Sequence, residues 1–268
     1  MEDLVPVALA PRLATRRLGR VYEFLASCGS TNDEIAARAA AHAEEGLVVA
    51  ADEQTGGRGR RGRAWHSPPG ENLYCSLFLR PDLPARLAPP LTLLASAALA
   101  QALTRLGFAP RLKWPNDVLL DTRTGLRKVA GVLAETASEG DRVRHIILGV
   151  GVNVNSRSFP EALSPIATSL RMASGRSLDR GELLAAFLNA FEPVYDGFLA
   201  AGPQVGLREW SRYAVLGQPC RVRRASRRIE GLATGIDATG ALLLRTAAGE
   251  TVAVHAGEVN WLPVSQAR

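Results

Sequence analysis

The chain has 268 residues, enough to bury one large core, or one large and one small core. Hydrophobic residues make up 47% and charged residues 22%, as in soluble globular proteins, and no stretch reads as low-complexity. The net charge of +6 favours anionic partners such as nucleotides, nucleic acids or acidic proteins.

The cysteines and apolar runs exclude several classes of protein. Cys28, Cys75 and Cys220 are widely spaced and form no CxxC pair, which argues against a disulfide framework or a zinc site and fits a reducing cytoplasm. Residues 1–20 lack the apolar core of a secretory signal, and no run approaches the roughly 20 apolar residues that span a bilayer.

The first third of the chain predicts one helix and two strands. Residues 1–20 contain prolines and arginines without periodicity, and are predicted to be a tail or a loosely attached edge. Ser30-Thr31-Asn32-Asp33-Glu34 is a helix N-terminus signal, so a helix is expected to about Ala43. Buried strands are predicted at residues 47–51 and 73–79, on either side of a glycine- and arginine-rich loop at residues 56–63.

The middle of the chain predicts a long core helix, further strands and two more helices. A helix from about Leu91 to Leu106 would end at Gly107. Strands are expected before Lys113 and at residues 118–120, 129–135 and 145–153, and helices at about residues 179–200 and 203–213. Because several strands follow one another without helices between them, an α+β fold with much antiparallel pairing is favoured over a doubly wound sheet.

From about Leu216 the pattern changes to short β-like runs separated by turns. The runs lie at residues 219–224, 228–236, 241–246 and 251–255, with hairpin-turn composition at residues 238–240 and 247–249. About fifty residues of this kind predict a small β-barrel. The expected organisation is an N-terminal tail (1–20), a large domain (21–215) and a small C-terminal domain (216–265).

The sharpest local signal is Gln54-Thr55-Gly56-Gly57-Arg58-Gly59-Arg60-Arg61-Gly62-Arg63-Ala64-Trp65. Glycines let the backbone approach a ligand, successive amides can form an anion-binding nest, and arginines add bidentate donors for phosphate. The pattern is not that of a P-loop. A phosphate grip, a nucleic-acid contact and a solvated basic loop remain open, and the position between two core strands favours the first.

Only two of the 32 basic residues are lysines, Lys113 and Lys128. Arginine replaces lysine easily on a surface, but not where a compact ammonium must fit against a carboxylate or phosphate. Lys113-Trp114-Pro115-Asn116-Asp117 sets two oxygen-bearing side chains after a rigid turn, which suits a hydrated Mg²⁺, a base edge or a structural Asx turn. Lys128 enters an apolar strand near Gly131, and either reaches a ligand or lies at the strand edge.

Together these segments resemble the biotin protein ligase family. The matching stretches, in the family's order and at its spacing, are Ser30-Thr31-Asn32, Gln54 to Trp65 with Asn72-Leu73-Tyr74, Lys113 to Asp117, Arg127 to Gly131 with Glu135, and Gly149 to Asn153. The resemblance covers roughly residues 21–263. It implies an α+β catalytic domain like those of class II aminoacyl-tRNA synthetases and biotin and lipoate ligases, followed by a C-terminal SH3-like β-barrel.

The resemblance also implies an activity and its residues. The enzyme would be an ATP-dependent biotin ligase that makes biotinyl-5′-AMP and transfers biotin to one lysine of a biotin carboxyl carrier protein. Carried over by position, biotin or its adenylate would be bound by Ser30, Thr31, Asn32, Gln54, Gly57, Arg58, Gly59, Arg60, Trp65, Lys128 and Gly131. Catalytic roles would fall to Lys128, Lys113 and Arg60, and the ATP and Mg²⁺ end to Asn116, Asp117 and Lys113, with Asp117 also a candidate base.

Cofactors and partners follow from the same resemblance. Mg²⁺ is expected to arrive with ATP and not to occupy a site made by protein groups alone, and the expected partner is a carboxylase carrier domain in the cytoplasm. No membrane and no DNA are expected, because about twenty residues ahead of the catalytic domain are too few for the helix-turn-helix of bifunctional members. A homodimer is left open. The alternatives are a lipoate-type ligase with a different acyl pocket and a basic nucleic-acid-binding protein.

Overall fold

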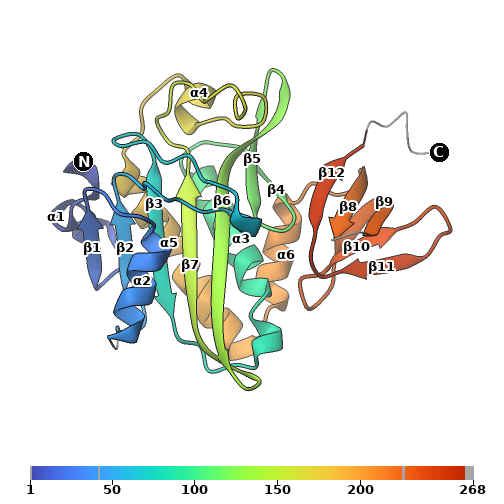
Figure 1. The fold of residues 1–268 in the computed structure, drawn as a ribbon, viewed down its shortest axis with the longest axis horizontal. Coiled ribbons are helices and arrows are strands. Elements are labelled where there is room, and N and C mark those ends of the chain that lie inside the picture. Colours follow the sequence, from blue (N-terminus) through green and yellow to red (C-terminus); the bar gives the residue numbers. More distant parts are fainter. Residues whose placement is uncertain (1, 42, 225–226, 263–268) are drawn as a thin grey trace.

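In the computed structural model, which describes residues 2–41, 43–224 and 227–262, a seven-stranded sheet organises the large domain (Figure 1). The strand order is β1-β2-β3-β7-β6-β5-β4. One pair, β1–β2, is parallel, and every other neighbouring pair is antiparallel, which confirms the expected α+β class. The strands are β1 (Tyr22–Leu25), β2 (Val48–Ala51), β3 (Leu73–Leu79), β4 (Pro110–Lys113), β5 (Asp117–Thr122), β6 (Gly125–Glu139) and β7 (Arg142–Val152).

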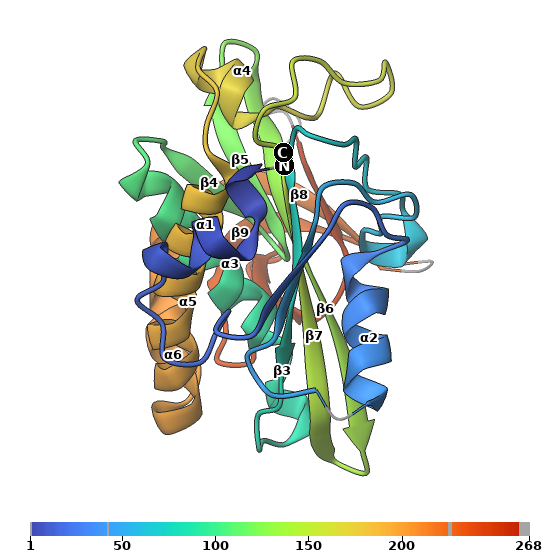
Figure 2. The ribbon, with the colours of Figure 1, turned by 90° about the vertical axis from the view of Figure 1, so that its left-hand side faces the viewer.

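Helices cover the two faces of this sheet unequally (Figure 2). Three helices, α3 (Pro90–Arg105), α5 (Arg180–Ala201) and α6 (Gln204–Tyr213), pack against one another on one face and bury the main core. The other face is covered only in part, by α2 (Thr31–Ala40), whose Ile35 packs on Val49, Phe78 and Ile147. The uncovered part of this face is where the predicted site residues meet.

A long apolar helix belongs to the core. The helical stretch Ala85–Arg105 is long and apolar enough to cross a membrane by length and composition, but 72% of its apolar 18-residue window is buried inside the fold. Helix α3 packs on α5 and α6, which agrees with the core helix that the sequence predicted at residues 91–106.

The C-terminal residues form a five-stranded antiparallel sheet in the order β11-β10-β9-β8-β12. Its strands are β8 (Pro219–Arg224), β9 (Arg227–Ile236), β10 (Leu242–Arg245), β11 (Thr251–Val254) and β12 (Glu258–Trp261). Both predicted hairpin turns are present, whereas β12 was not predicted. The indole of Trp114 donates to the carbonyl of Gly240 (2.9 Å), so the large domain holds the turn before β10 directly.

The N-terminal residues are not a loosely attached edge, and that prediction is wrong. Residues 2–18, the N-terminal strap, contain η1 (Glu2–Leu4), α1 (Pro6–Leu9) and η2 (Ala10–Arg12), with Leu4, Leu9 and Leu18 at most 1% exposed. At the far end of the strap, the Glu192 carboxylate of α5 accepts the amides of Arg16, Arg17 and Leu18 at 2.6, 3.0 and 2.8 Å. The sequence showed no periodicity because polar contacts along α5 hold much of the strap.

Candidate functional site

The alternation of side chains along β7 builds the floor of the site. Ile147, Gly149 and Gly151 point to the face that carries α2, while Leu148 and Val150 point into the main core. Across the ladder Gly151 pairs with Gly131 of β6. A Cβ on Gly149 would lie 2.4 Å from Asn32 Oδ1, and one on Gly151 would lie 2.7 Å from the Trp65 indole. Glycine is therefore required for Asn32 and Trp65 to lie directly on the sheet.

Over this floor lies a cavity of about 520 Å³. All but one of the predicted site residues line it, including both lysines. The exception is Gly57, which is buried below the loop, where a Cβ would lie 2.6 Å from Ser67 Oγ and 2.8 Å from the Trp65 carbonyl. The lining residues among those predicted are Ser30, Thr31, Asn32, Gln54, Arg58, Gly59, Arg60, Trp65, Lys113, Asn116, Asp117, Lys128 and Gly131.

One end of the cavity is a cluster of amides and hydroxyls. Gln54 Oε1 accepts the backbone amide and the hydroxyl of Thr31 at 2.9 and 3.1 Å. Ser76 Oγ lies 2.7 Å from Thr31 Oγ1 and donates to Asn32 Oδ1 at 2.6 Å. Ser30 is the N-cap residue of α2, yet its side chain makes no cap bond. This end offers neutral donors and acceptors in fixed positions. The sequence did not predict Ser76 as a site residue, because no pattern distinguishes it from the other residues of its strand.

The other end is formed by the arginine-glycine loop and the C-terminal domain. Arg63 pairs with Glu258 at 2.9 Å, and Arg61 lies 3.9 Å from the same carboxylate. Arg60 donates to the Gly257 carbonyl and to Asn116 Oδ1, each at 3.5 Å. Arg61 at the loop tip has a φ of 59°, in the left-handed region that side chains rarely adopt. Glu258 was not predicted, since no motif surrounds it.

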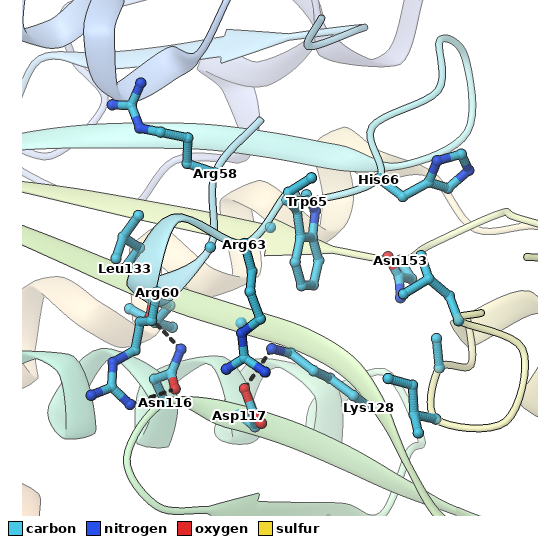
Figure 3. Close-up of a pocket in the computed structure, with 18 of the residues that line it drawn as sticks. Arg58, Arg60, Arg63, Trp65, His66, Asn116, Asp117, Lys128, Leu133 and Asn153 are labelled. Carbon is cyan, nitrogen blue, oxygen red and sulfur yellow. Dashed lines mark hydrogen bonds and ion pairs between the residues drawn. The ribbon is translucent and has the colours of Figure 1, made fainter. Parts of the chain in front are cut away.

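Arg58 lies apart from the other loop arginines. It makes a bidentate pair with Asp33 at 2.6 Å and approaches Glu135 to 3.6 Å, while Glu135 also accepts from Asn32. Figure 3 shows Arg58 directed away from Arg60, Asn116 and Asp117. In this arrangement Arg58 joins the loop to the start of α2.

Lys113 is a cation with no carboxylate partner in the part of the chain that the structure describes. It is partly buried at the end of β4, and no Asp or Glu of the part of the chain that the structure describes lies within ion-pair distance of its ammonium. Burial lowers the pKa of Lys113, although Asp117 and Glu258 nearby counteract this. A half-buried cation of this kind favours an anion beside it.

Lys128 is held between a carboxylate and an aromatic ring. Its ammonium lies 2.5 Å from Asp117 Oδ1 and 5.1 Å from the centre of the Trp65 ring (Figure 3). The Trp65 indole N–H is buried and has no acceptor within the described residues. The family resemblance assigned Lys128 to biotin or its adenylate and Asp117 to the ATP and Mg²⁺ end, and the structure brings the two side chains into contact.

Asn116 has a structural contact as well as a place in the site. Its Nδ2 donates to the Val132 carbonyl at 3.0 Å, and the Val132 amide donates back to the Asn116 carbonyl at 3.0 Å. Its Oδ1 faces Arg60. Within residues 2–41, 43–224 and 227–262, no group of three or more His, Cys, Asp or Glu side chains is arranged to hold a metal ion.

An apolar wall on the remaining side of the cavity was missed from the sequence. The segment after β7 runs beside β6, with the Lys128 amide donating to the Ile166 carbonyl and the Thr168 amide to the Lys128 carbonyl, both at 2.8 Å. The short helix α4 (Leu170–Ser174) follows. The wall consists of Leu119, Leu126, Phe159, Leu163, Pro165 and Ile166. The segment after β7 is rich in polar residues and prolines, so its sequence shows no periodic pattern.

Both parts of the chain match known protein families. Residues 26–153 match the Biotin/lipoate A/B protein ligase family, and residues 215–260 match the Biotin protein ligase C terminal domain. The chain is 42% identical over 212 residues to the bifunctional ligase/repressor BirA of Bacillus spizizenii. That match covers 78% of this chain and 64% of the relative, so the chain spans just under two thirds of it.

Two further proteins are covered almost from end to end. The biotin–[acetyl-CoA-carboxylase] ligase of Paracoccus denitrificans is 38% identical over 246 residues, which is 88% of this chain and 98% of the relative. The biotin protein ligase of Aquifex aeolicus, solved in complex with biotin and ATP, aligns with a TM-score of 0.78 and 28% identity over 91% of this chain and 99% of that one. The chain belongs to the biotin protein ligase family.

Proposed function

We propose that the chain is an ATP-dependent biotin ligase, which activates biotin as biotinyl-5′-AMP and transfers it to a lysine of a biotin carboxyl carrier domain. One observation carries the proposal. One cavity joins a neutral cluster around Gln54 and Thr31 to a cationic end, where Lys113 has no carboxylate partner among the described residues. This arrangement suits a ligand that is a neutral polar ring at one end and an anion at the other.

The neutral end suits the ureido group of biotin. A ureido group has two N–H donors and one carbonyl acceptor, and the amides and hydroxyls of Thr31, Asn32 and Gln54 supply the complementary groups. The apolar ring and chain of biotin would then lie over the glycine floor beside Trp65. The ligand carboxylate would meet Lys128, as the family resemblance implies.

The cationic end suits the first chemical step. A biotin carboxylate oxygen forms a bond to the α-phosphorus of ATP, the bond from that phosphorus to the β-bridging oxygen breaks, and pyrophosphate leaves. Two anions must approach each other, and each unit-charge pair at about 4 Å is worth roughly 4 kcal/mol at an effective dielectric near 20. Lys113, Lys128 and Arg60 offset this repulsion. No enzyme nucleophile is required.

The nucleotide has two contact regions. The adenine base would lie against the apolar wall near Phe159 and Ile166, and the phosphates near Lys113 and Arg60. Mg²⁺ would enter bound to ATP and neutralise phosphate charge. Asn116 and Asp117 provide oxygens of the type that Mg²⁺ prefers, but Asp117 already pairs with Lys128, so the phosphates would remain its main ligands.

The second step requires a neutral amine on the carrier. A lysine amine has a pKa near 10.4 in a model peptide and must lose its proton before it attacks the adenylate. Asp117 is the candidate base, since its second carboxylate oxygen is not the one paired with Lys128. The partner would be the carrier domain of a carboxylase in the cytoplasm. The proposed fold assignment is a class II synthetase-like catalytic domain with an SH3-like barrel formed by β8–β12.

The test is adenylate formation with each acid. The protein is mixed with ATP, Mg²⁺ and either biotin or lipoate, and AMP and pyrophosphate are measured with and without an acceptor carrier domain. Biotin-dependent pyrophosphate release is expected. Release with lipoate and none with biotin would overturn the proposal in favour of a lipoate-type ligase. Salt-sensitive binding to random DNA without a thermal shift by biotin would favour a nucleic-acid-binding protein.

A further inference from the structure

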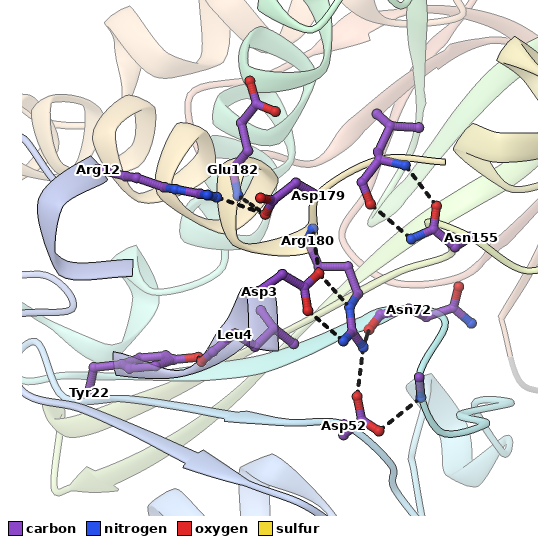
Figure 4. A network of polar contacts seen from close by, with 12 residues as sticks. Asp3, Leu4, Arg12, Tyr22, Asp52, Asn72, Asn155, Asp179, Arg180 and Glu182 are labelled. Carbon is purple, nitrogen blue, oxygen red and sulfur yellow. Dashed lines mark hydrogen bonds and ion pairs between the residues drawn. The ribbon is translucent and has the colours of Figure 1, made fainter. Parts of the chain in front are cut away.

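A buried arginine connects the N-terminal strap to the loop that carries the site (Figure 4). Arg180, the first residue of α5, is 1% exposed. Its guanidinium donates to both carboxylate oxygens of Asp3 at 2.7 and 3.0 Å, to Asp52 Oδ1 at 2.8 Å and to the Asn72 carbonyl at 3.2 Å. A single side chain thus contacts the strap, the end of β2 and the start of β3.

Asp52 is placed to close the loop at its base. It follows β2 directly and precedes Gln54 by two residues. While Oδ1 accepts from Arg180, Oδ2 accepts the backbone amide of Gly70 at 2.9 Å. The carboxylate therefore joins the two ends of residues 52–70, the segment that contains Gln54, the arginine-glycine loop and Trp65.

The charges in this cluster depend on one another. Arg180 and Asp52 are almost fully buried, so each requires the other, and the loss of one partner leaves an uncompensated buried charge. Burial opposes ionisation of Asp3, but its bonds to Arg180 outweigh this and lower its pKa to about 2. Asp3 supplies the second negative charge that holds the guanidinium fork in its orientation.

We propose that Asp3 and Arg180 are positioning residues for the biotin-binding end of the active site, so that the N-terminal strap sets the affinity for biotin. The inference rests on the proposed function. Asp3 orients Arg180, Arg180 orients Asp52, and Asp52 fixes the chain two residues before Gln54.

The effect is confined to one end of the cavity. The phosphate end has a second anchor, because Arg60, Arg61 and Arg63 contact Gly257, Arg223 and Glu258 of the C-terminal domain. The biotin end has no such support from the C-terminal domain among the described residues. Loosening the base of the loop therefore weakens biotin binding more than ATP binding.

The experiment compares Asp3→Asn with Glu192→Gln in the full chain. Both substitutions loosen the strap, but Glu192 binds the amides of residues 16–18 and makes no contact with residues 52–70. Asp3→Asn is expected to raise the KM for biotin about tenfold, the effect of losing one charge-assisted contact, while the KM for ATP stays within about twofold. Glu192→Gln is expected to lower the melting temperature and leave both KM values within about twofold.

A second measurement needs no activity. Amide hydrogen exchange over residues 53–70 in the ligand-free protein is expected to be faster in Asp3→Asn than in wild type, and unchanged in Glu192→Gln. Equal effects of both variants on the KM for biotin, or unchanged amide exchange in Asp3→Asn, would overturn the proposal that Asp3 and Arg180 position the biotin-binding end. If wild type makes no biotinyl adenylate, the proposed function fails, and the exchange comparison still decides whether Asp3 holds the loop.

Discussion

Lys128 shows why an arginine-rich chain retains a lysine at one position. Its ammonium occupies the space between Asp117 and the face of Trp65. A guanidinium is wider and planar, so Lys128→Arg keeps the charge but displaces one of these neighbours. We expect kcat/KM for biotin to fall about 100-fold, as for the loss of a well-placed charge in a transition state.

The control is an exchange between arginine and lysine at a surface position. Arg105 is exposed at the end of α3, and Arg105→Lys is expected to leave kcat/KM unchanged. Turnover of Lys128→Arg near the wild-type rate at saturating biotin and ATP would show that the site requires only charge at position 128.

The glycine floor gives a second prediction. In Gly151→Ala the new methyl group would lie 2.7 Å from the Trp65 indole, which must then move. Overpacking of this size costs about 1–3 kcal/mol, so we expect the KM for biotin to rise about tenfold. Gly235→Ala, in a strand with open space around the position, is the matched control. Equal biotin titrations for the two variants would contradict a role for the floor.

At this scale the sequence predicted which residues gather but not which of them touch. The glycines, arginines and lysines stood in recognisable segments, and the structure brings those segments to one cavity. The contact of Asp117 with Lys128 was not predictable. It depends on the register of β5 against β6, which shifts between Val118 and Leu119. No local pattern reports such a shift.

Among the elements, the N-terminal strap makes the fold sensitive to acid. The bonds that Glu192 accepts from three backbone amides outweigh its burial and lower its pKa below the ordinary 4.5, and the pKa of Asp3 falls from 3.8 to about 2. Carboxyl groups with a lowered folded pKa stabilise the fold above their unfolded pKa, and this contribution is lost as the pH falls through the folded value. For Asp3 the contribution is about 2 kcal/mol.

Urea unfolding at several pH values tests this sensitivity. We expect the free energy of unfolding of wild type to fall between about pH 5 and pH 2, and to fall less in Glu192→Gln, which has no carboxylate to protonate at this position. Parallel curves for the two proteins over this range would contradict a contribution from Glu192.

Elements with a clear period were predicted within a few residues, and those without one were missed. The apolar run of residues 73–79 forms β3 with the expected bounds, and helix α5 begins and ends within one residue of its prediction. Strand β1 and the strap were missed, because the side chains of β1 are only half-buried and the strap is held largely by polar contacts with α5.

Across the whole molecule, the C-terminal domain restrains the arginine-glycine loop through Glu258. Glu258→Gln removes the ion pair with Arg63 and the nearby charge for Arg61. Partly exposed pairs contribute about 0.2–1 kcal/mol, so we expect tryptic cleavage within residues 58–63 to become about two- to fivefold faster in the native protein. Glu230→Gln, which breaks the exposed pair with Arg221, is expected to leave this cleavage rate unchanged.

Cleavage at the wild-type rate in Glu258→Gln would mean that the remaining contacts with Gly257 and Arg223 are sufficient. The sequence did not predict that the C-terminal domain contributes residues to the cavity. Motifs identified the large domain's side of the cavity, whereas Glu258 and Trp261 reach it only because the two parts of the chain pack together.

The bond between Asp3 and Arg180 also sets an order of events during synthesis. The two residues are 177 positions apart, so the strap leaves the ribosome long before α5 exists. At 5–20 residues per second this interval is roughly 10–35 s. Until then the strap lacks its contacts with α5, and Asp52 at the base of the Gln54 loop lacks the guanidinium of Arg180. A nascent chain therefore cannot complete its biotin end before most of the large domain has been translated.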